Sequence, residues 1–162
     1  MIILLINYHS GHNLVNIINE SLNSGVIRSI IVVNNSYDDF VIDDIFYDDR
    51  VISLSALENL GYSGGNNLAF HVAGVNGIKD DICIMNGDIT CDSKVFRVCK
   101  QAMANDDSCG QIGVSTVGHG GKHLYSAIKM RGMRQKFDPR GDFPLVDSDY
   151  VAGSFLLIRC EA

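Results

Sequence analysis

The sequence lacks the excess of basic residues that a nucleic-acid-binding protein normally needs. It contains 13 Lys and Arg against 19 Asp and Glu, which gives a formal net charge of −6. Because a surface that meets a phosphate backbone is usually basic, this balance argues against nucleic acid as a partner. The charge is uneven, since residues 1–120 carry 6 basic against 14 acidic residues and residues 121–162 carry 7 against 5.

Paired cysteines and long apolar runs are also missing. The five cysteines are odd in number and form no CxxC pair, which argues against a disulfide framework or a zinc site and favours a reducing cytoplasm. No segment approaches the roughly 18 apolar residues of a membrane span. No basic leader precedes the short apolar run in MIILLINYHSG, so we interpret it as a first strand and expect a cytoplasmic protein.

Several catalytic signatures are absent as well. The sequence contains no GxGxxG and no GxxxxGK(S/T), so neither dinucleotide nor P-loop binding is indicated. His9 and His12, and likewise His119 and His123, have metal-like spacing but no acidic third ligand on an obvious helix. Amides, glycines and carboxylates remain as candidates for a functional site.

Short apolar runs rich in Ile and Val alternate with segments of helical spacing. The candidate strands are residues 2–6, 27–33, 51–54, 81–85, 111–115 and 150–158, and the candidate helices are residues 13–25, 64–77 and 93–106. This alternation is typical of an α/β fold with a mostly parallel sheet and helices on both faces. With 46% hydrophobic residues and no repeat or linker, residues 1–162 are long enough for one domain with a buried core.

Short polar side chains follow three of the predicted strands directly. NYHSGHN follows the first strand, NNSYDD the second and NGDITCD the fourth, while ENLGYSGGNNLAF at residues 58–70 follows the third. In an open α/β sheet the ligand crevice lies at the carboxyl ends of the strands. We therefore expect these clusters to converge on one site, although a surface turn is the alternative for NNSYDD.

The N-x-D segment offers two hard oxygen ligands. Asn86 and Asp88 can point an amide oxygen and a carboxylate toward one crevice, which suits Mg²⁺ or Mn²⁺ when a diphosphate supplies further ligands. The alternative is a β-turn that caps the next helix, because Asn, Gly and Asp are common turn residues.

The glycine-rich segment combines backbone freedom with short amides. Gly61, Gly64 and Gly65 would let the backbone approach a ligand closely. Asn66 and Asn67 would stand near a helix N-terminus, whose partial positive charge suits an anion. A tight strand-to-helix crossover is the alternative explanation.

In this order, the clusters resemble those of the family 2 glycosyltransferases of the GT-A fold, especially the rhamnosyltransferase-like branch. LINYHSG resembles the family's first-strand pattern, VVNNSYDD its VVDNxSxD segment, NLGYSGGNNLAF its NxGxxGGNNxG segment and IMNGDIT the NPD variant of its DxD motif. YVAGSFLLIRCEA resembles a later segment in which a glycine-small pair precedes an apolar strand ending in Arg. The resemblance covers essentially the whole chain and implies a GT-A domain that binds a nucleotide-diphospho-sugar donor.

The resemblance also implies roles for individual residues. The nucleotide-sugar site would comprise Asn7, Tyr8, Asn34, Asp38, Asn59, Gly61, Gly65, Asn66, Asn67, Asn86 and Gly153, and Asp88 would bind Mg²⁺ or Mn²⁺. Asn34 stands where the family usually has Asp, which keeps hydrogen bonding but loses a charge. Gly87 replaces the proline of NPD, and Asp39 is a rival for Asp38 because NNSYDD is one residue shorter than the usual spacing.

The reaction that the resemblance implies is sugar transfer with inversion, in the synthesis of a cell-surface polysaccharide. The cation would stabilise the departing diphosphate while a carboxylate deprotonates an acceptor hydroxyl. In the family this base lies downstream of the strand that ends here at Arg159, and Glu161 is a poor substitute so close to the chain end. We therefore expect a truncated donor-binding part whose catalytic residue is unknown, with Asp147 and Asp149 as first candidates if the base lies within the chain.

The basic segment at residues 129–140, KMRGMRQKFDPR, has two interpretations. It is either a solvated loop or a landing site for an anionic glycan or lipid-linked acceptor, with peripheral contact to the inner face of a membrane. Two rival functions also stay open. One is a non-catalytic nucleotide-sugar-binding domain, and the other is a sugar-nucleotide pyrophosphorylase, which should carry a glycine-rich loop with Arg where this chain has NYHSGHN.

Overall fold

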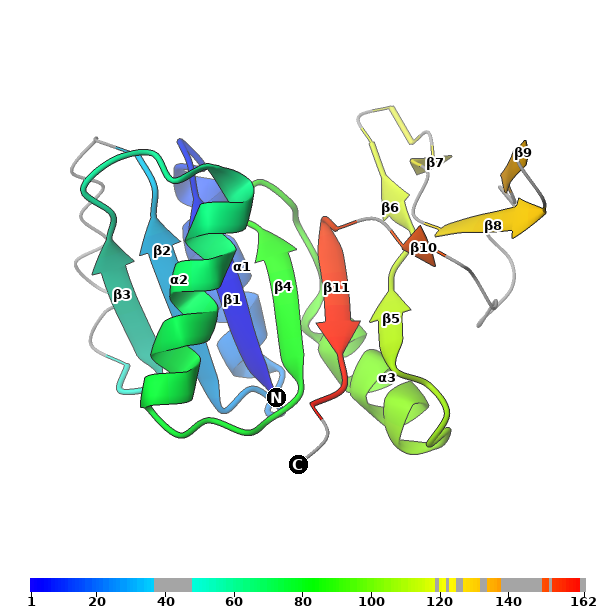
Figure 1. Cartoon of the computed structure of the whole chain (residues 1–162), viewed down its shortest axis with the longest axis horizontal. Helices are drawn as coiled ribbons and strands as arrows, with labels where there is room; N and C mark the ends of the chain where they lie inside the picture. Colours follow the sequence, from blue (N-terminus) through cyan, green and yellow to red (C-terminus); the bar gives the residue numbers. More distant parts are fainter. Residues whose placement is uncertain are drawn as a thin grey trace.

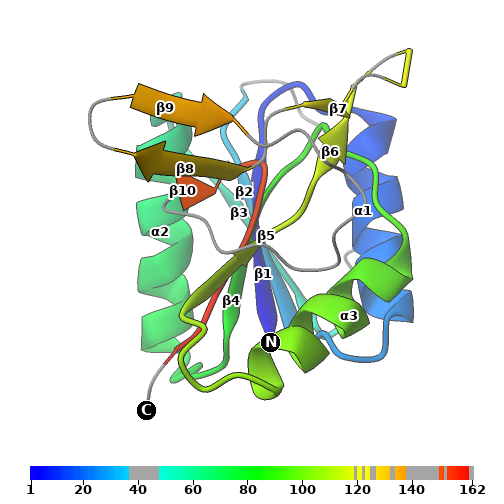
Figure 2. The same cartoon turned by 90° about the vertical axis from the view of Figure 1, so that its right-hand side faces the viewer.

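A six-stranded sheet lies between helices on its two faces (Figure 1 and Figure 2). The computed structural model describes residues 1–36, 48–118, 120–121, 123–124, 127–131, 134–137, 150–151 and 153–160. Helix α2 (Gly61–Val75) covers one face, and helices α1 (His12–Asn23) and α3 (Ser93–Ala104) cover the other. The predicted α/β class, with a mostly parallel sheet and helices on both faces, is confirmed.

The main sheet has the strand order β3-β2-β1-β4-β11-β5. Its strands are β1 (Ile2–Asn7), β2 (Ser29–Asn34), β3 (Val51–Ser55), β4 (Ile82–Asn86), β5 (Gln111–Gly113) and β11 (Phe155–Ile158). Strands β1 to β4 are parallel, whereas β11 is antiparallel to both β4 and β5. The carboxyl ends of the four parallel strands therefore lie on one edge of the sheet, at the top of Figure 1.

The central strand β1 is buried on both faces, because its side chains alternate between two apolar layers. Ile3 and Leu5 belong to the cluster that α1 and α3 cover, while Ile2, Leu4 and Ile6 belong to the cluster that α2 covers. None of these five side chains is more than 7% exposed. The side chains of β2 and β4 alternate between the same two layers. Both strands therefore appear in the sequence as continuous apolar segments.

The three predicted helices are confirmed, with shifts at their ends. Helix α3 follows Asp92, whose side chain accepts a hydrogen bond of 2.8 Å from the Lys94 backbone N–H, as an N-cap aspartate does. Helix α2 begins at Gly61, earlier than predicted, so most of the glycine-rich segment forms its first turns. Gly25 and Gly77, with φ of 73° and 65°, follow α1 and α2 and supply the left-handed conformation that ends many helices.

The prediction of one strand over residues 150–158 is wrong. This segment forms two strands, β10 (Tyr150–Val151) and β11, which belong to different sheets. A turn at Gly153 and Ser154 separates them. Glycine permits such a bend inside an apolar run, and the pattern of apolar residues alone does not record it.

The basic segment at residues 129–140 is a hairpin in its described part, not a loop. Strand β8 (Ala127–Arg131) pairs antiparallel with β9 (Arg134–Phe137) and also with β10. Two short strands, β6 (Thr116–Val117) and β7 (His123–Leu124), form a second ladder. Both ladders lie beyond β5, toward the carboxyl end of the parallel strands (Figure 1).

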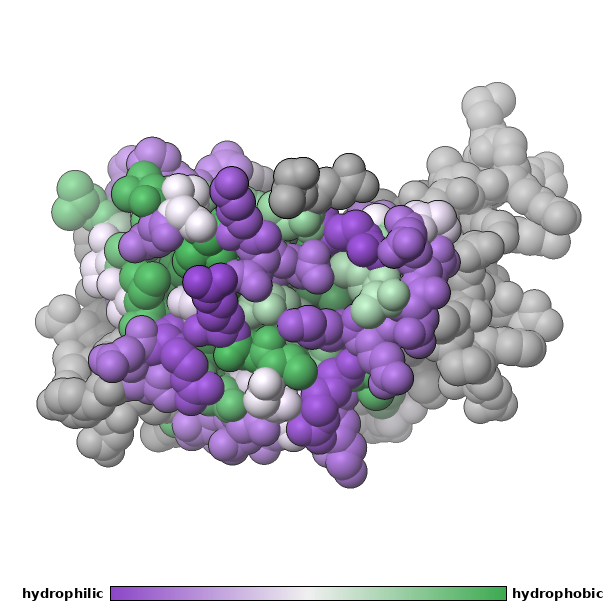
Figure 3. Space-filling view, turned by 90° about the horizontal axis from the view of Figure 1, so that it is seen from below, coloured by the Kyte–Doolittle hydropathy of each residue, from purple (hydrophilic) through white to green (hydrophobic). Residues whose placement is uncertain are grey.

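The amino end of the sheet is held by charged and backbone contacts. Arg28 Nη1 donates to Asp80 Oδ2 at 2.9 Å, and the N-terminal ammonium of Met1 lies 3.7 Å from Asp80 Oδ1. The Ile2 N–H donates to the Asp81 carbonyl at 2.9 Å. Figure 3 shows the molecule from this side, with hydrophilic residues spread over the surface and hydrophobic groups between them. The polar contacts at this end join chain segments and hold the strands together.

The five cysteines are free thiols, of which Cys83 and Cys99 are buried. Burial raises the pKa of Cys99 to about 11. Burial, followed by the charges of Glu20 and Asp92, likewise raises the pKa of Cys91 to about 11, so its thiolate is disfavoured at neutral pH. None of the helices in the described part of the chain combines the length and apolar character that a membrane crossing requires.

We expect Gly65→Val to destabilise the fold, because the new side chain meets β1. A Cβ at position 65 would lie 3.1 Å from Ile6 Cδ1 and 3.3 Å from Ile6 Cγ2, and valine adds two methyl groups there. Overpacking of this kind lowers the free energy of unfolding by about 1–3 kcal/mol. Gly74→Val is the matched control in the same helix, because a Cβ at Gly74 meets nothing within 4 Å. Equal losses in urea denaturation of the two variants would contradict this packing role.

Candidate functional site

Polar side chains gather at the carboxyl end of the sheet from several segments of the chain. They follow β1, β2 and β4, and they occupy the connection from β3 into α2, which passes over the top of the sheet in Figure 1. We refer to Asn7, Asn34, Asn35, Asn59 and Asn86 as the strand-end cluster. The sequence predicted that these segments converge, and the hydrogen bonds between them show how they do.

Asn7 and Asn34, the last residues of β1 and β2, bond to each other. Asn7 Nδ2 donates to Asn34 Oδ1 at 3.0 Å, and Asn7 Oδ1 accepts from the Ser10 backbone N–H at 3.1 Å. Asn34 Oδ1 also accepts from Ser36 Oγ at 2.8 Å. Since Asn7 is only 2% exposed, its amide organises the turns that follow β1 and β2 and faces protein groups on both sides.

Asn35, which the sequence analysis did not select, joins β2 to the glycine-rich segment. Its Nδ2 donates to Asn59 Oδ1 and to the Gly61 carbonyl, both at 3.1 Å, and its Oδ1 accepts from the Leu60 N–H at 2.9 Å. Asn35 is 3% exposed, so its amide supplies the hydrogen bonds that water would otherwise make to three polar groups. The Asn34–Asn35 pair after an apolar strand is the signal in the sequence, but only the structure separates the two roles.

The predicted glycines serve different purposes. Gly61 has a φ of 66°, a conformation that glycine adopts without strain, and its N–H donates to Asn59 Oδ1 at 2.9 Å. Gly65 is buried against Ile6 of β1. Close packing of α2 on β1 accounts for Gly65, in keeping with the tight strand-to-helix crossover that was the alternative for this segment.

Asn66 is buried and carries an unpaired oxygen. Its Nδ2 donates to the Tyr62 carbonyl at 3.0 Å, and the residue is 6% exposed. Its Oδ1 is buried and has no hydrogen-bond partner among the described residues. Asn67, the next residue along α2, is exposed, so the two predicted asparagines lie in different environments.

Tyr62 connects the start of α2 with the turn before β11. Its hydroxyl donates to the Gly153 carbonyl at 2.8 Å, across 91 positions of the sequence. The next residue, Ser154, accepts a hydrogen bond of 3.2 Å from the Asn86 N–H through its carbonyl. The predicted residue Gly153 thus lies beside both α2 and the N-x-D segment, and Tyr62 is a contact that sequence reasoning missed.

Asn86 and Asp88, the two ends of the N-x-D segment, differ in exposure. Asn86 Oδ1 is buried and has no hydrogen-bond partner in the described part of the chain, whereas Asp88 is exposed. Of the two oxygen ligands that the sequence predicts here, only Asp88 is exposed to solvent. Between them, a Cβ on Gly87 would lie 2.5 Å from Ser10 Oγ and 3.0 Å from the Ile6 carbonyl oxygen. Any side chain at this position would require Ser10 to move, so the packing favours glycine there.

Tyr8 and His9 stand at the exposed end of β1. Tyr8 is 55% exposed, and its ring centroid lies 4.5 Å from that of His9 at an interplanar angle of 65°. His9 has a φ of 56°, which is uncommon outside glycine. An exposed aromatic ring at this end can stack on a planar ligand such as a nucleobase.

The candidate carboxylates other than Asp88 fall on parts of the chain that the structure leaves out. Asp38, Asp39, Asp147, Asp149 and Glu161 lie outside the described residues. Within the described residues, no three His, Cys, Asp or Glu side chains are grouped closely enough to hold a metal ion. Asp88 is therefore the one predicted carboxylate that can be placed at the strand ends.

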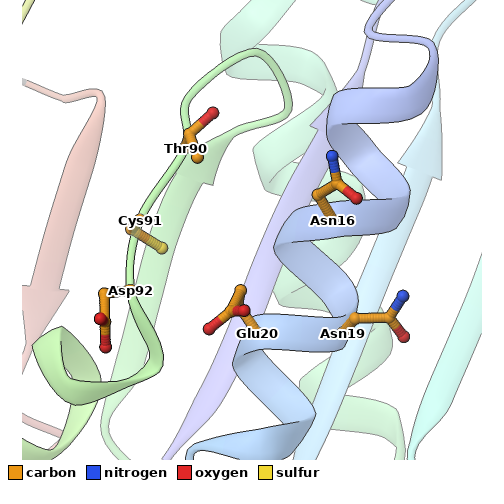
Figure 4. A pocket seen from close by; sticks show the side chains of 6 residues that line it. All are labelled: Asn16, Asn19, Glu20, Thr90, Cys91 and Asp92. Carbon is orange, nitrogen blue, oxygen red and sulfur yellow. The ribbon is translucent and has the colours of Figure 1, made fainter.

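An open pocket of about 480 Å³ lies on the face of the sheet that α1 and α3 cover, between α1 and the segment after β4 (Figure 4). It is lined by Asn16, Asn19, Glu20, Thr90, Cys91 and Asp92. Glu20 Oε2 accepts a hydrogen bond of 3.0 Å from the Ser93 N–H and so ties α1 to the start of α3. The sequence analysis did not predict this pocket, whose residues come from two segments far apart in the chain.

Comparisons with known proteins show similarity in structure alone. No family model and no curated protein matches the chain. The structure of TarS 1-349 from S. aureus, a GT-A-like glycosyltransferase, superposes with a TM-score of 0.61 at 14% identity, over 97% of this chain and 46% of that one. Our chain thus spans less than half of the length of that structure.

Two further matches are to nucleotidyltransferase-like proteins. A 4-diphosphocytidyl-2C-methyl-D-erythritol synthase gives a TM-score of 0.60 at 12% identity, over 97% of this chain and 74% of the other. The corresponding synthase from Anaerococcus prevotii DSM 20548 gives 0.57 at 14% identity, over 98% and 70%. At these identities the likeness concerns the fold alone, which is α/β and is shared with structural neighbours of the GT-A-like and nucleotidyltransferase types.

We expect Asn35→Ala to lower the free energy of unfolding by about 1–3 kcal/mol, because it leaves buried polar groups without partners. The Leu60 N–H and the Gly61 carbonyl lose their bonds to this amide. Asn76→Ala is the control, because Asn76 is exposed and makes one bond, to the Val72 carbonyl. The free energy of unfolding of Asn76→Ala should fall by no more than about 0.5 kcal/mol in urea denaturation. A loss for Asn35→Ala no larger than this would show that Asn35 does not hold the segment in place.

Proposed function

We propose that the chain binds a nucleotide-diphospho-sugar at the strand-end cluster and acts as a glycosyltransferase of the GT-A type. The observation that carries this proposal is the convergence of the start of α2, the Gly153 turn and the exposed Asp88 at the carboxyl ends of the parallel strands. Ligands of open α/β sheets bind at this end. The resemblance of four segments to family 2 glycosyltransferases and the fold likeness to a GT-A-like structure support it.

The start of α2 suits the diphosphate. A helix N-terminus carries partial positive charge and directs backbone N–H groups outward, which favours phosphate. No acidic residue lies in the first turn of α2, and its N-cap residue Leu60 makes no side-chain cap. The Gly61 N–H is already bonded to Asn59 Oδ1, but no carboxylate in the first turn offsets the partial charge of the helix. Tyr8, exposed at the end of β1, is the ring we assign to the nucleobase.

Asp88 is the residue that would hold a divalent cation. Its exposed carboxylate is a hard oxygen ligand of the kind that Mg²⁺ and Mn²⁺ prefer. Because no group of three candidate ligands occurs among the described residues, the site suits a cation that takes its other ligands from phosphate and water. When bound, such a cation offsets the charge that develops on the departing diphosphate.

The transfer itself requires a hydroxyl acceptor and a base. The acceptor oxygen bonds to the anomeric carbon, the bond from that carbon to the diphosphate breaks, and a carboxylate takes the hydroxyl proton. Asp147 and Asp149, which precede β10 in the sequence, are the candidates for this carboxylate. The family resemblance favours inversion at the anomeric carbon and a glycan or lipid-linked acceptor of cell-surface polysaccharide synthesis.

Nucleotidyl transfer is the second candidate function, because two synthases of nucleotidyltransferase type share the fold over 74% and 70% of their length. The products separate the two reactions. Sugar transfer or donor hydrolysis releases a nucleoside diphosphate, whereas nucleotidyl transfer from a nucleoside triphosphate releases pyrophosphate. Binding of a nucleotide-sugar with neither product would instead identify a non-catalytic binding domain.

We expect Asp88→Ala to abolish the dependence of nucleotide binding on Mn²⁺. Loss of a charged ligand weakens metal-assisted binding by about tenfold or more. Calorimetric titration of UDP and dTDP, with Mn²⁺ and with EDTA, measures the effect. Asp107→Ala removes an equal charge from an exposed site after α3 and serves as the control. Unchanged titrations of Asp88→Ala, with and without metal, would remove Asp88 from the site.

The basic hairpin is proposed to serve the acceptor side. Its register places Lys129 opposite Lys136 and Arg131 opposite Arg134, which concentrates basic residues on one two-stranded ladder. This arrangement favours an anionic partner. In lipid-linked acceptors and inner-leaflet membranes, that partner is phosphate.

Replacing Arg131, Arg134 and Lys136 together by Gln should weaken binding to phosphatidylserine vesicles by about 100-fold, since each basic residue near such a surface contributes about 1 kcal/mol. Nucleotide affinity should not change. The control replaces Lys79, Lys94 and Lys100, which are exposed on other elements. Vesicle binding by the parent protein that does not respond to salt would contradict an electrostatic role.

A further inference from the structure

Two buried amide oxygens flank Ile6 at the carboxyl end of β1, and neither has a hydrogen-bond partner among the described residues. They are Asn66 Oδ1 and Asn86 Oδ1. Asn86 is paired with Ile6 in the register of β1 and β4, and Gly65, which precedes Asn66, packs against Ile6. Ile84, two residues before Asn86, packs into the cluster beneath α2. The alternation of β4 therefore places Asn86 on the α2 side of the sheet, where Asn66 also lies.

A continuous set of contacts joins these two amides. Asn66 Nδ2 donates to the Tyr62 carbonyl, and the Tyr62 hydroxyl donates to the Gly153 carbonyl. The adjacent Ser154 carbonyl accepts from the Asn86 N–H. The Tyr62–Gly153 hydrogen bond is exposed, whereas the amide oxygens are buried. It is therefore the contact in this set that can open without uncovering the core.

The orientation of the Asn66 amide follows from its partner. The Tyr62 carbonyl can only accept a hydrogen bond, so the amide nitrogen of Asn66 must face it and the oxygen is left unpaired. A buried acceptor without a donor destabilises a folded protein. Departures from full hydrogen bonding of this kind are expected at functional sites, where a ligand supplies the missing partner.

We propose that Asn66 and Asn86 form a hydroxyl-binding subsite for the sugar of the donor, reached when the Tyr62–Gly153 contact opens. This proposal rests on the proposed function. Both unpaired atoms are acceptors, so they select groups that donate, such as sugar hydroxyls. Phosphate oxygens without protons do not donate, and the diphosphate is assigned to the start of α2. Ribose hydroxyls also donate, and the UDP and dTDP arms of the test separate a subsite for ribose from one for the transferred sugar.

The test compares nucleoside diphosphates with nucleotide-sugars by calorimetry in the presence of Mn²⁺. The probes are UDP, dTDP, UDP-glucose, UDP-galactose and dTDP-glucose, with deoxyfluoro forms of each sugar, whose fluorine cannot donate. We expect at least one sugar to strengthen binding about tenfold over its nucleoside diphosphate and one deoxyfluoro form to lose that gain. Asn66→Leu and Asn86→Leu should remove the same gain, so that each variant binds a nucleotide-sugar no more tightly than it binds the matching nucleoside diphosphate. Because Asn66→Leu also removes an unpaired buried oxygen, its thermal midpoint should rise by a few degrees.

Asn76→Leu is the matched control. Asn76 makes the same bond to the carbonyl four positions earlier, Val72, at 2.8 Å, but it is exposed and lies at the other end of α2. It should change neither affinity. A sugar that adds nothing to nucleoside diphosphate binding would overturn the subsite and leave the proposed function intact. If Asn66→Leu weakens the binding of nucleoside diphosphates and of nucleotide-sugars equally, Asn66 has a structural role. If the variant has a higher thermal midpoint but keeps the gain in affinity from the sugar, the two amide oxygens bind water and not sugar. No binding of any probe would overturn the proposed function as well.

Discussion

The burial of β1 on both faces is the constraint on which the rest of the structure depends. Each residue from Ile2 to Ile6 enters one of two apolar layers, so the strand must be central and helices must cover both sides of the sheet. Parallel neighbours then require crossover connections, which bring every carboxyl end to the same edge. Polar residues that cannot enter either layer collect where the apolar runs stop. The candidate site is thus a consequence of where β1, β2 and β4 end.

Asparagine makes most of the connections at that edge. Each amide offers both donors and an acceptor, so Asn7 and Asn35 each link two or more chain segments without adding charge. A neutral network suits a protein with a net charge of −6 that is proposed to bind a diphosphate, because additional carboxylates would repel the ligand. The oxygens of Asn66 and Asn86, which have no hydrogen-bond partner among the described residues, are exceptions among these amides.

The glycines near the site show why a motif does not by itself identify ligand contacts. Gly61 supplies a left-handed backbone, Gly65 allows α2 to pack on Ile6, and Gly87 leaves room for Ser10 and the Ile6 carbonyl. All three are required by protein geometry alone. The same segments can still shape a ligand site, because close packing of α2 on β1 is what brings the helix N-terminus to the carboxyl end of the sheet.

Local patterns in the sequence determined the fold class, the three helices and the ends of the parallel strands, because burial imposes a period of two on strands and of 3.6 on helices. The same patterns indicated that polar residues meet at one edge. The tertiary structure alone decided that residues 150–158 divide at Gly153, that β11 runs antiparallel beside β4, and that Asn35 rather than Asn34 holds the glycine-rich segment. It also decided which of Asn86 and Asp88 is exposed. These features rest on contacts between distant residues, such as Tyr62 with Gly153, and no local pattern records the partner that a side chain meets only after the chain has folded.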